Sequence, residues 1–75
     1  SLVAVLANEP GSLADVTKII SLNDGNISNI QVFSRDLDYY KFNIDLEVKN
    51  ITHLNQIIAA MRLSEFVESV ERGKD

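Results

Sequence analysis

Hydrophobic and polar positions divide the chain into segments of two different periods. Residues 2–7 form an apolar run without a charge, which predicts a central strand with neighbours on both sides. Residues 27–35 mix apolar and polar positions on both faces and predict an edge strand. Residues 40–49 alternate most regularly, so one face of the predicted sheet is buried and the other faces water. A shorter apolar run at residues 66–70 predicts the last strand.

Two segments between these strands repeat their apolar residues at the spacing of an amphipathic helix. The first stripe consists of Leu13, Val16, Ile19 and Ile20, and the second consists of Leu54, Ile57, Ile58 and Met61. We therefore expect two helices, each with one face packed on the sheet.

The sequence also predicts where the helices begin and where the first one ends. After the turn at Gly11, Ser12 is expected to cap the first helix, with Asp15 as the acidic half of a capping box. Residues 23–26 contain the Gly and Asn that suit a left-handed helix end. Thr52 is the expected cap of the second helix.

The order of elements is strand, helix, strand, strand, helix, strand, with residues 36–38 as a hairpin connection. Two βαβ-type halves that obey right-handed crossovers give an α+β, ferredoxin-like βαββαβ sandwich. We expect a four-stranded antiparallel sheet in the order 4-1-3-2, with both helices on one face. This order agrees with the sequence, because the first and third strands carry the strongest apolar patterns.

Length and charge narrow the classes of function. The chain has 75 residues and is expected to be a single domain, residues 1–75, whose small core would gain stability from a partner subunit. It carries 7 Lys and Arg against 11 Asp and Glu, a net charge of −4, and its cations are scattered, which disfavours autonomous nucleic-acid binding. The absence of Cys excludes disulfides and thiol chemistry. The chain starts in a strand, without Met, membrane span or signal peptide, and is interpreted as part of a longer, soluble protein.

The remaining polar residues show no recognisable catalytic pattern. Asp45 and Glu47 share a strand face with Lys41 and Lys49, a pattern typical of a solvated charged surface. His53 is the only histidine and has no nucleophile or acid at a recognisable spacing, so it is interpreted as a surface or boundary residue. No P-loop, nucleophile elbow or dinucleotide fingerprint is present. We therefore expect no catalytic residue, no metal and no cofactor, and no enzyme activity of this segment by itself.

The turn at residues 8–13 is the best candidate for a binding site. Gly11 permits a backbone conformation that other residues resist, and the following helix points its N–H groups and positive dipole end at the turn. Such a place can hold a carboxylate. The local pattern alone favours a simple tight connection, so both interpretations stay open at this point.

Three runs of the sequence resemble a known family. They are Asn8-Glu9-Pro10-Gly11-Ser12-Leu13-Ala14-Asp15-Val16, Gly25-Asn26-Ile27, and His53-Leu54-Asn55-Gln56-Ile57-Ile58-Ala59-Ala60-Met61-Arg62 with residues 67–72. Together they resemble an ACT domain, most closely the one that ends the RelA/SpoT-type (p)ppGpp synthetase/hydrolases, also called GTP pyrophosphokinases. The Pro-Gly turn is shared by ACT domains in general, whereas the run that begins at His53 points to the RelA/SpoT group. The resemblance covers nearly the whole chain.

The resemblance implies a regulatory module of a cytoplasmic enzyme of the bacterial stringent response, with the catalytic domains upstream in the same chain. ACT domains commonly form homodimers side by side through the second strand and the first helix, and many bind an amino acid between the subunits. Here the walls of that site would be Asn8, Pro10, Gly11 and Ser12 from one subunit and Asn26, Ile27 and Ser28 from the other.

In this arrangement Asn8 and Asn26 would be the polar clamps, and N–H groups of the loop would receive the carboxylate of a small amino acid, such as a branched-chain one. RelA/SpoT-type proteins also use their C-terminal modules to contact the ribosome and tRNA. The resemblance therefore makes the ribosome an expected partner of the full-length protein, while no membrane contact is expected.

Two departures from the family pattern keep other functions open. Leu6 stands where some amino-acid-binding relatives have a polar or His side chain, and Glu9 adds negative charge beside the expected carboxylate position. One alternative is a protein-interaction or assembly module that binds no small molecule. Another is the amino-acid-binding ACT domain of a different metabolic enzyme.

Overall fold

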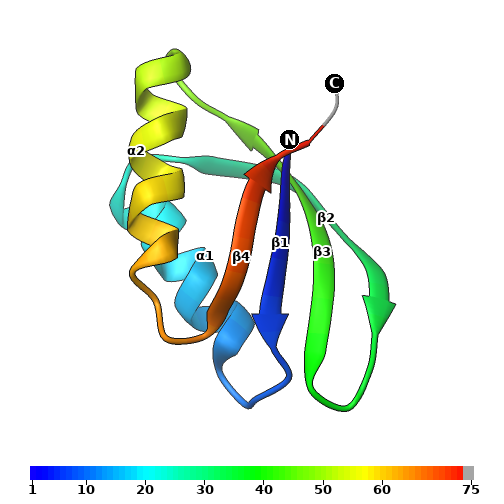
Figure 1. Ribbon diagram of the computed structural model, residues 1–75. Coiled ribbons are helices and arrows are strands. Elements are labelled where there is room, and N and C mark those ends of the chain that lie inside the picture. The colour runs from blue at the N-terminus through cyan, green and yellow to red at the C-terminus, as the bar shows by residue number, and fades with distance from the viewer. Residues whose placement is uncertain (74–75) are drawn as a thin grey trace.

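The computed structural model describes residues 1–73, and its elements follow the predicted order (Figure 1). The elements are β1 (Leu2–Ala7), α1 (Ser12–Leu22), β2 (Asn26–Arg35), β3 (Tyr39–Glu47), α2 (Ile51–Arg62) and β4 (Val67–Arg72). The end of the chain was expected to be a polar tail from Gly73. The Gly73 N–H donates to the Ser1 carbonyl at 2.9 Å, and the rest of that tail lies outside the described residues. No helix within residues 1–73 is long and apolar enough to cross a membrane.

The four strands form one antiparallel sheet in the order β2-β3-β1-β4. The apolar strand β1 lies in the interior, where Leu2 is opposite Ile44 of β3 and Arg72 of β4. Both helices lie on one face of the sheet (Figure 1). This arrangement confirms the predicted ferredoxin-like sandwich with strand order 4-1-3-2.

The core lies between the sheet and the two helices, and every second residue of β1 and β3 contributes to it. Its buried apolar residues are Leu2, Ala4, Leu6, Val16, Ile20, Phe42, Ile44, Ile57, Ile58, Met61 and Val70. The alternation predicted for the third strand is confirmed, because Phe42 and Ile44 are buried while Lys41 on the other face is exposed. Burial of these side chains is the main favourable term in folding.

The edge strand β2 is incompletely covered by the helices. Ile30 lies opposite Ile44 and Val32 lies opposite Phe42, which places both on the helix side of the sheet. Val32 nevertheless remains 46% exposed, since the helices cover little of this strand (Figure 1). The register shifts between Val32 and Ser34, and Phe33 at this irregularity is 58% exposed. Val32 and Phe33 therefore form an exposed apolar strip at the outer edge of the sheet.

The start of α1 differs from the prediction. Gly11, with a left-handed φ of 85°, is the N-cap, and no side chain caps the helix. Ser12 lies inside the first turn and is only 2% exposed, so it cannot serve as the predicted cap. Asp15 forms no capping box, because its Oδ2 accepts a hydrogen bond of 2.6 Å from the Ser64 hydroxyl. The tertiary contact to the α2–β4 loop has replaced the local one.

The end of α1 uses Asp24 for the left-handed conformation, with φ 62°, in place of the predicted Gly or Asn. Gly25 is needed for a different reason. A Cβ at Gly25 would lie 2.8 Å from a methyl carbon of Ile20 and 2.8 Å from one of Ile57. The α1–β2 turn therefore packs directly on both helices, and only glycine leaves room for this close approach.

Helix α2 is capped by Asn50 and not by Thr52, which lies exposed in the first turn. Asn50 has an extended backbone, and its Oδ1 accepts a 2.9 Å hydrogen bond from the His53 N–H. At the other end of the helix, the Arg62 guanidinium donates to the Val70 carbonyl at 3.0 Å. This bond joins the last turn of α2 to β4.

Truncation of the core on α2 should reduce stability far more than truncation of an exposed residue of the same type. We expect Ile57→Ala, at a fully buried position, to lower the free energy of unfolding by about 2–5 kcal/mol. Ile51→Ala is the matched control, because Ile51 is 50% exposed and should cost less than about 1 kcal/mol. Urea unfolding followed by circular dichroism measures both values. Equal losses would contradict the described core.

The capping residues of α2 can be separated in the same way. Asn50→Ala removes the acceptor of the His53 N–H and should cost about 1 kcal/mol of unfolding free energy. Thr52→Ala should change stability by less than about 0.5 kcal/mol, because the exposed Thr52 side chain is no cap. Thermal unfolding of the two variants compares them directly, and a larger loss for Thr52→Ala would restore the cap expected from sequence.

Candidate functional site

The first candidate surface is the loop wall, which we define as residues 8–12 between β1 and α1. The Asn8 N–H donates to the Asp38 carbonyl at 2.8 Å, and the Asn8 side-chain amide donates to the Asp36 carbonyl at 2.9 Å. These bonds hold the loop against the β2–β3 hairpin. A Cβ at Gly11 would find no atom within 4 Å, so the space above this residue is open.

The loop wall can offer hydrogen-bond donors to a ligand through the N–H groups of the first turn of α1. The Ser12 N–H donates to the Glu9 carbonyl at 3.2 Å, whereas those of Leu13 and Ala14 have no intrahelical acceptor. No side chain caps them, since the N-cap residue is Gly11. Uncapped N–H groups at the positive end of a helix dipole can receive a carboxylate. The buried Ser12 side chain, in contrast, offers almost no surface to a ligand.

The second candidate surface is the strand wall, which we define as residues 26–28 at the start of β2. The Asn26 amide donates to Glu47 Oε1 at 2.6 Å, and the Ser28 hydroxyl donates to the Asp45 carbonyl at 3.2 Å. Ile27 between them is half-buried opposite Leu46. The strand wall thus presents two exposed polar residues that are already fixed to β3.

The structure does not bring the two walls together within one chain. Asn8 follows Ala7, which lies opposite Tyr39 at the start of β3, whereas Asn26 lies opposite Glu47 at its end. A nine-residue strand separates these positions by roughly 25 Å. Figure 1 shows the β1–α1 loop at one end of the sheet and the start of β2 towards the other. A site that uses both walls therefore requires two copies of the chain.

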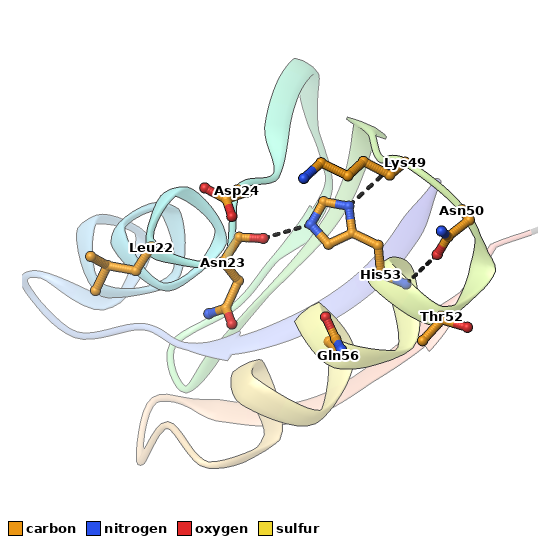
Figure 2. Close-up of a pocket in the computed structure, with 8 residues that line it drawn as sticks. All are labelled: Leu22, Asn23, Asp24, Lys49, Asn50, Thr52, His53 and Gln56. Carbon is orange, nitrogen blue, oxygen red and sulfur yellow. Dashed lines mark hydrogen bonds between the residues drawn. The ribbon is translucent and has the colours of Figure 1, made fainter.

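A separate pocket of about 460 Å³ lies between the end of α1 and the start of α2 (Figure 2). Its lining residues are mostly polar and come from the α1–β2 turn and the β3–α2 junction: Leu22, Asn23, Asp24, Lys49, Asn50, Thr52, His53 and Gln56. Lys49 and Asp24 bring opposite charges to its lining. Within residues 1–73, no group of three or more His, Cys, Asp or Glu side chains is placed to hold a metal ion.

His53 is buried and makes contacts through both ring nitrogens, contrary to the prediction of a surface or boundary residue. It is 9% exposed, and its Nδ1 accepts a 3.0 Å hydrogen bond from the Lys49 N–H. Its Nε2 lies 2.6 Å from the Asn23 carbonyl. A carbonyl only accepts, so the proton is assigned to Nε2 and the ring links two segments of the chain (Figure 2).

Sequence reasoning overlooked His53 because it asked only whether a lone histidine could catalyse. The spacing did contain a signal: His53, Ile57 and Met61 lie four residues apart, on the buried stripe of α2. A polar residue on such a stripe needs hydrogen-bond partners. Its partners could not be named from the sequence, since Asn23 is 30 residues away.

The chain is similar to one protein family and to a group of curated proteins. The profile of the ACT domain family matches residues 1–72. A protein named GTP pyrophosphokinase rsh from Brucella ovis is 40% identical over 65 residues, which are 87% of this chain and 9% of that protein. The chain thus spans about a tenth of the length of the curated relatives it matches.

Solved structures agree with this result. The crystal structure of the ACT domain from GTP pyrophosphokinase of Chlorobium tepidum superimposes with a TM-score of 0.80 at 28% identity, covering 96% of this chain and 92% of that one. The C-terminal domain of the MgtC protein from Mycobacterium tuberculosis has a TM-score of 0.63 at 18% identity, with 93% and 79% covered, and shares the fold alone. The resemblance predicted from sequence is confirmed.

Proposed function

The chain belongs to the ACT domain family, and on that premise we propose that it is the regulatory module of a RelA/SpoT-type GTP pyrophosphokinase. In this role it acts in the cytoplasm as a homodimer, binds a small amino acid between its subunits and relays that signal to catalytic domains elsewhere in the same chain. The names of its relatives and the length of those relatives support the assignment. In the full-length protein a contact with the ribosome would be a further role.

The exposed edge of the sheet supports the dimer. Residues 26–34 of β2 carry no charge, although natural edge strands are usually protected by charges or prolines against pairing with another chain. Val32 and Phe33 add exposed apolar surface along the same edge. A second copy that pairs through β2 would cover this strip and satisfy the free N–H and C=O groups of the strand. It would also provide a second chain, which a site built from both walls requires.

The observation that carries the ligand-binding role is the uncapped start of α1 beneath open space. A free amino acid has a carboxylate, which suits the N–H groups of Leu13 and Ala14, and an ammonium group, which needs acceptors. The Oδ1 atoms of Asn8 and Asn26 can accept, because each side chain uses its amide nitrogen for the hydrogen bonds within the chain. The two walls together thus match both charged groups of an amino acid.

A ligand-free assembly module is the second candidate, and a specific observation favours it. The side-chain amides of Asn8 and Asn26 already donate within the chain, to Asp36 and to Glu47. Glu9 also brings a negative charge to the loop that would receive a carboxylate. In this case the β2 edge would serve association alone.

The dimer can be tested by placing a charge on the exposed strip of β2. We expect the protein to dimerise at high concentration and Val32→Lys to raise the dimer dissociation constant by about tenfold or more, because a charge blocks the pairing edge. Ser69→Lys on the opposite edge strand β4 is the control and should leave the constant unchanged. Sedimentation velocity measures all three. A wild type that stays monomeric to millimolar concentration would refute the dimer.

Ligand binding can be tested by NMR titration with valine, leucine, isoleucine, serine and glycine at a concentration that populates the dimer. We expect saturable amide shifts in both walls for at least one of these amino acids. Asn26→Ala should weaken that binding about tenfold through loss of a polar contact, whereas Asn55→Ala on the exposed face of α2 should not change it. Without shifts in a folded, dimeric sample, the assembly module becomes the better function.

A further inference from the structure

The α1–β2 turn is held in place by the first turn of α2. The Asn23 carbonyl, at the end of α1, is bonded to His53 Nε2 at 2.6 Å. Gly25 packs against Ile57 so closely that a Cβ would come within 2.8 Å of its methyl carbon. Figure 2 shows the His53 ring between the turn and the β3–α2 junction. Asn23 and Gly25 of the turn therefore both contact α2.

This turn leads without any intervening residue into the strand wall. Gly25 is followed by Asn26, whose side chain is bonded to Glu47. The other nitrogen of the His53 ring accepts from the N–H of Lys49, two residues after Glu47. The ring thus holds both segments that frame the strand wall: the turn that precedes Asn26 and the end of β3 that Asn26 contacts.

We propose that His53 is the positioning residue of the strand wall and that its ring couples this wall to the start of α2. The proposal rests on the proposed function in one respect, because the strand wall would be one half of the ligand site. The strand wall and the first turn of α2 then move together. A ligand that binds one arrangement of the strand wall more tightly also favours the matching arrangement of that turn. The coupling is local, because it passes through only two hydrogen bonds of the His53 ring. Nε2 bonds to the Asn23 carbonyl, and Nδ1 accepts from the Lys49 N–H.

Because each ring nitrogen serves a different segment, the two contacts can be removed one at a time. His53→Asn places an amide oxygen near the position of Nδ1, so it keeps an acceptor for the Lys49 N–H and loses the donor to Asn23. His53→Gln places an amide nitrogen near the position of Nε2, so it keeps the donor to Asn23 and loses the acceptor. Gln56→Ala is the control, since Gln56 lines the same pocket and is exposed.

Amide hydrogen exchange, measured by NMR on the unliganded chain, reports on the contacts of the His53 ring with Asn23 and with Lys49. The Gly25 N–H, bonded to the Ile20 carbonyl, reports on the turn, and the Lys49 N–H reports on the β3–α2 junction. We expect His53→Asn to speed exchange at Gly25 about tenfold and to shift the resonances of residues 26–28. His53→Gln should instead speed exchange at Lys49 by a similar factor and leave exchange at Gly25 close to its wild-type rate.

Two results would overturn the proposal. One is equal exchange and equal shifts in both variants, which would make the ring a packing element with no separate contacts. The other is a His53→Asn variant whose residues 24–28 behave like those of Gln56→Ala. Circular dichroism confirms that each variant is folded before these rates are compared.

A measurement on the wild type covers the case in which His53→Asn does not fold. With the imidazole labelled by ¹⁵N, the proton should be found on Nε2, as the Asn23 contact requires. During titration with valine, the ring resonances should move with the same saturation as residues 26–28. Shifts of those residues with an unmoved ring would refute the coupling. If valine and the other amino acids do not bind, the ligand site fails and the exchange experiment still decides the positioning role.

Discussion

The interior position of β1 is the constraint on which the rest of the structure depends. This strand is hydrogen-bonded to β3 on one side and to β4 on the other, and alternate side chains are buried beneath the helices. A strand without charges can occupy such a place, because all its peptide groups are paired by its neighbours and its side chains tolerate burial. Once β1 is central, its end fixes where the loop wall begins, and the antiparallel pairing with β3 fixes where β2 begins and ends.

The same topology separates the two halves of the proposed ligand site. The loop wall follows the end of β1, and the strand wall lies opposite the far end of β3. One copy of the chain can therefore only present them at distant places, and a binding site would couple ligand occupancy to association of two copies. Binding and assembly would then stabilise each other, which is the thermodynamic requirement for a regulatory dimer. In the proposed dimer, this association would depend on the uncharged edge of β2.

The two helix starts differ from the sequence prediction in different ways: a tertiary contact replaces a local one at α1, and a different local cap is used at α2. Asp15 bonds to Ser64 across 49 residues of sequence and leaves the start of α1 uncapped, while Asn50 caps α2 in place of Thr52. The uncapped start of α1 leaves N–H groups free at the loop wall, and the cap of α2 aligns His53 with Asn23. In the proposed function the two helix starts would have different roles: the first would receive a ligand, and the second would hold the strand wall.

The sequence by itself determined the order of elements, the sheet order, the buried stripes of both helices and the family, because periodicity and turn residues act over a few neighbouring positions. It also identified Asn8, Gly11 and Asn26 as candidate site residues, through the resemblance, which assigned Asn26 and the other two residues to different subunits. Only the tertiary structure decided the helix caps, the role of Gly25 and the burial of His53. The Asn50 cap of α2 is local, and the sequence offered Thr52 as an equally suitable cap two residues on. Most of these features, however, depend on partners distant in sequence: Ser64 for Asp15, Ile57 for Gly25 and Asn23 for the His53 ring. Local patterns contain no information on such pairs, since the sheet brings them together only after the chain has folded.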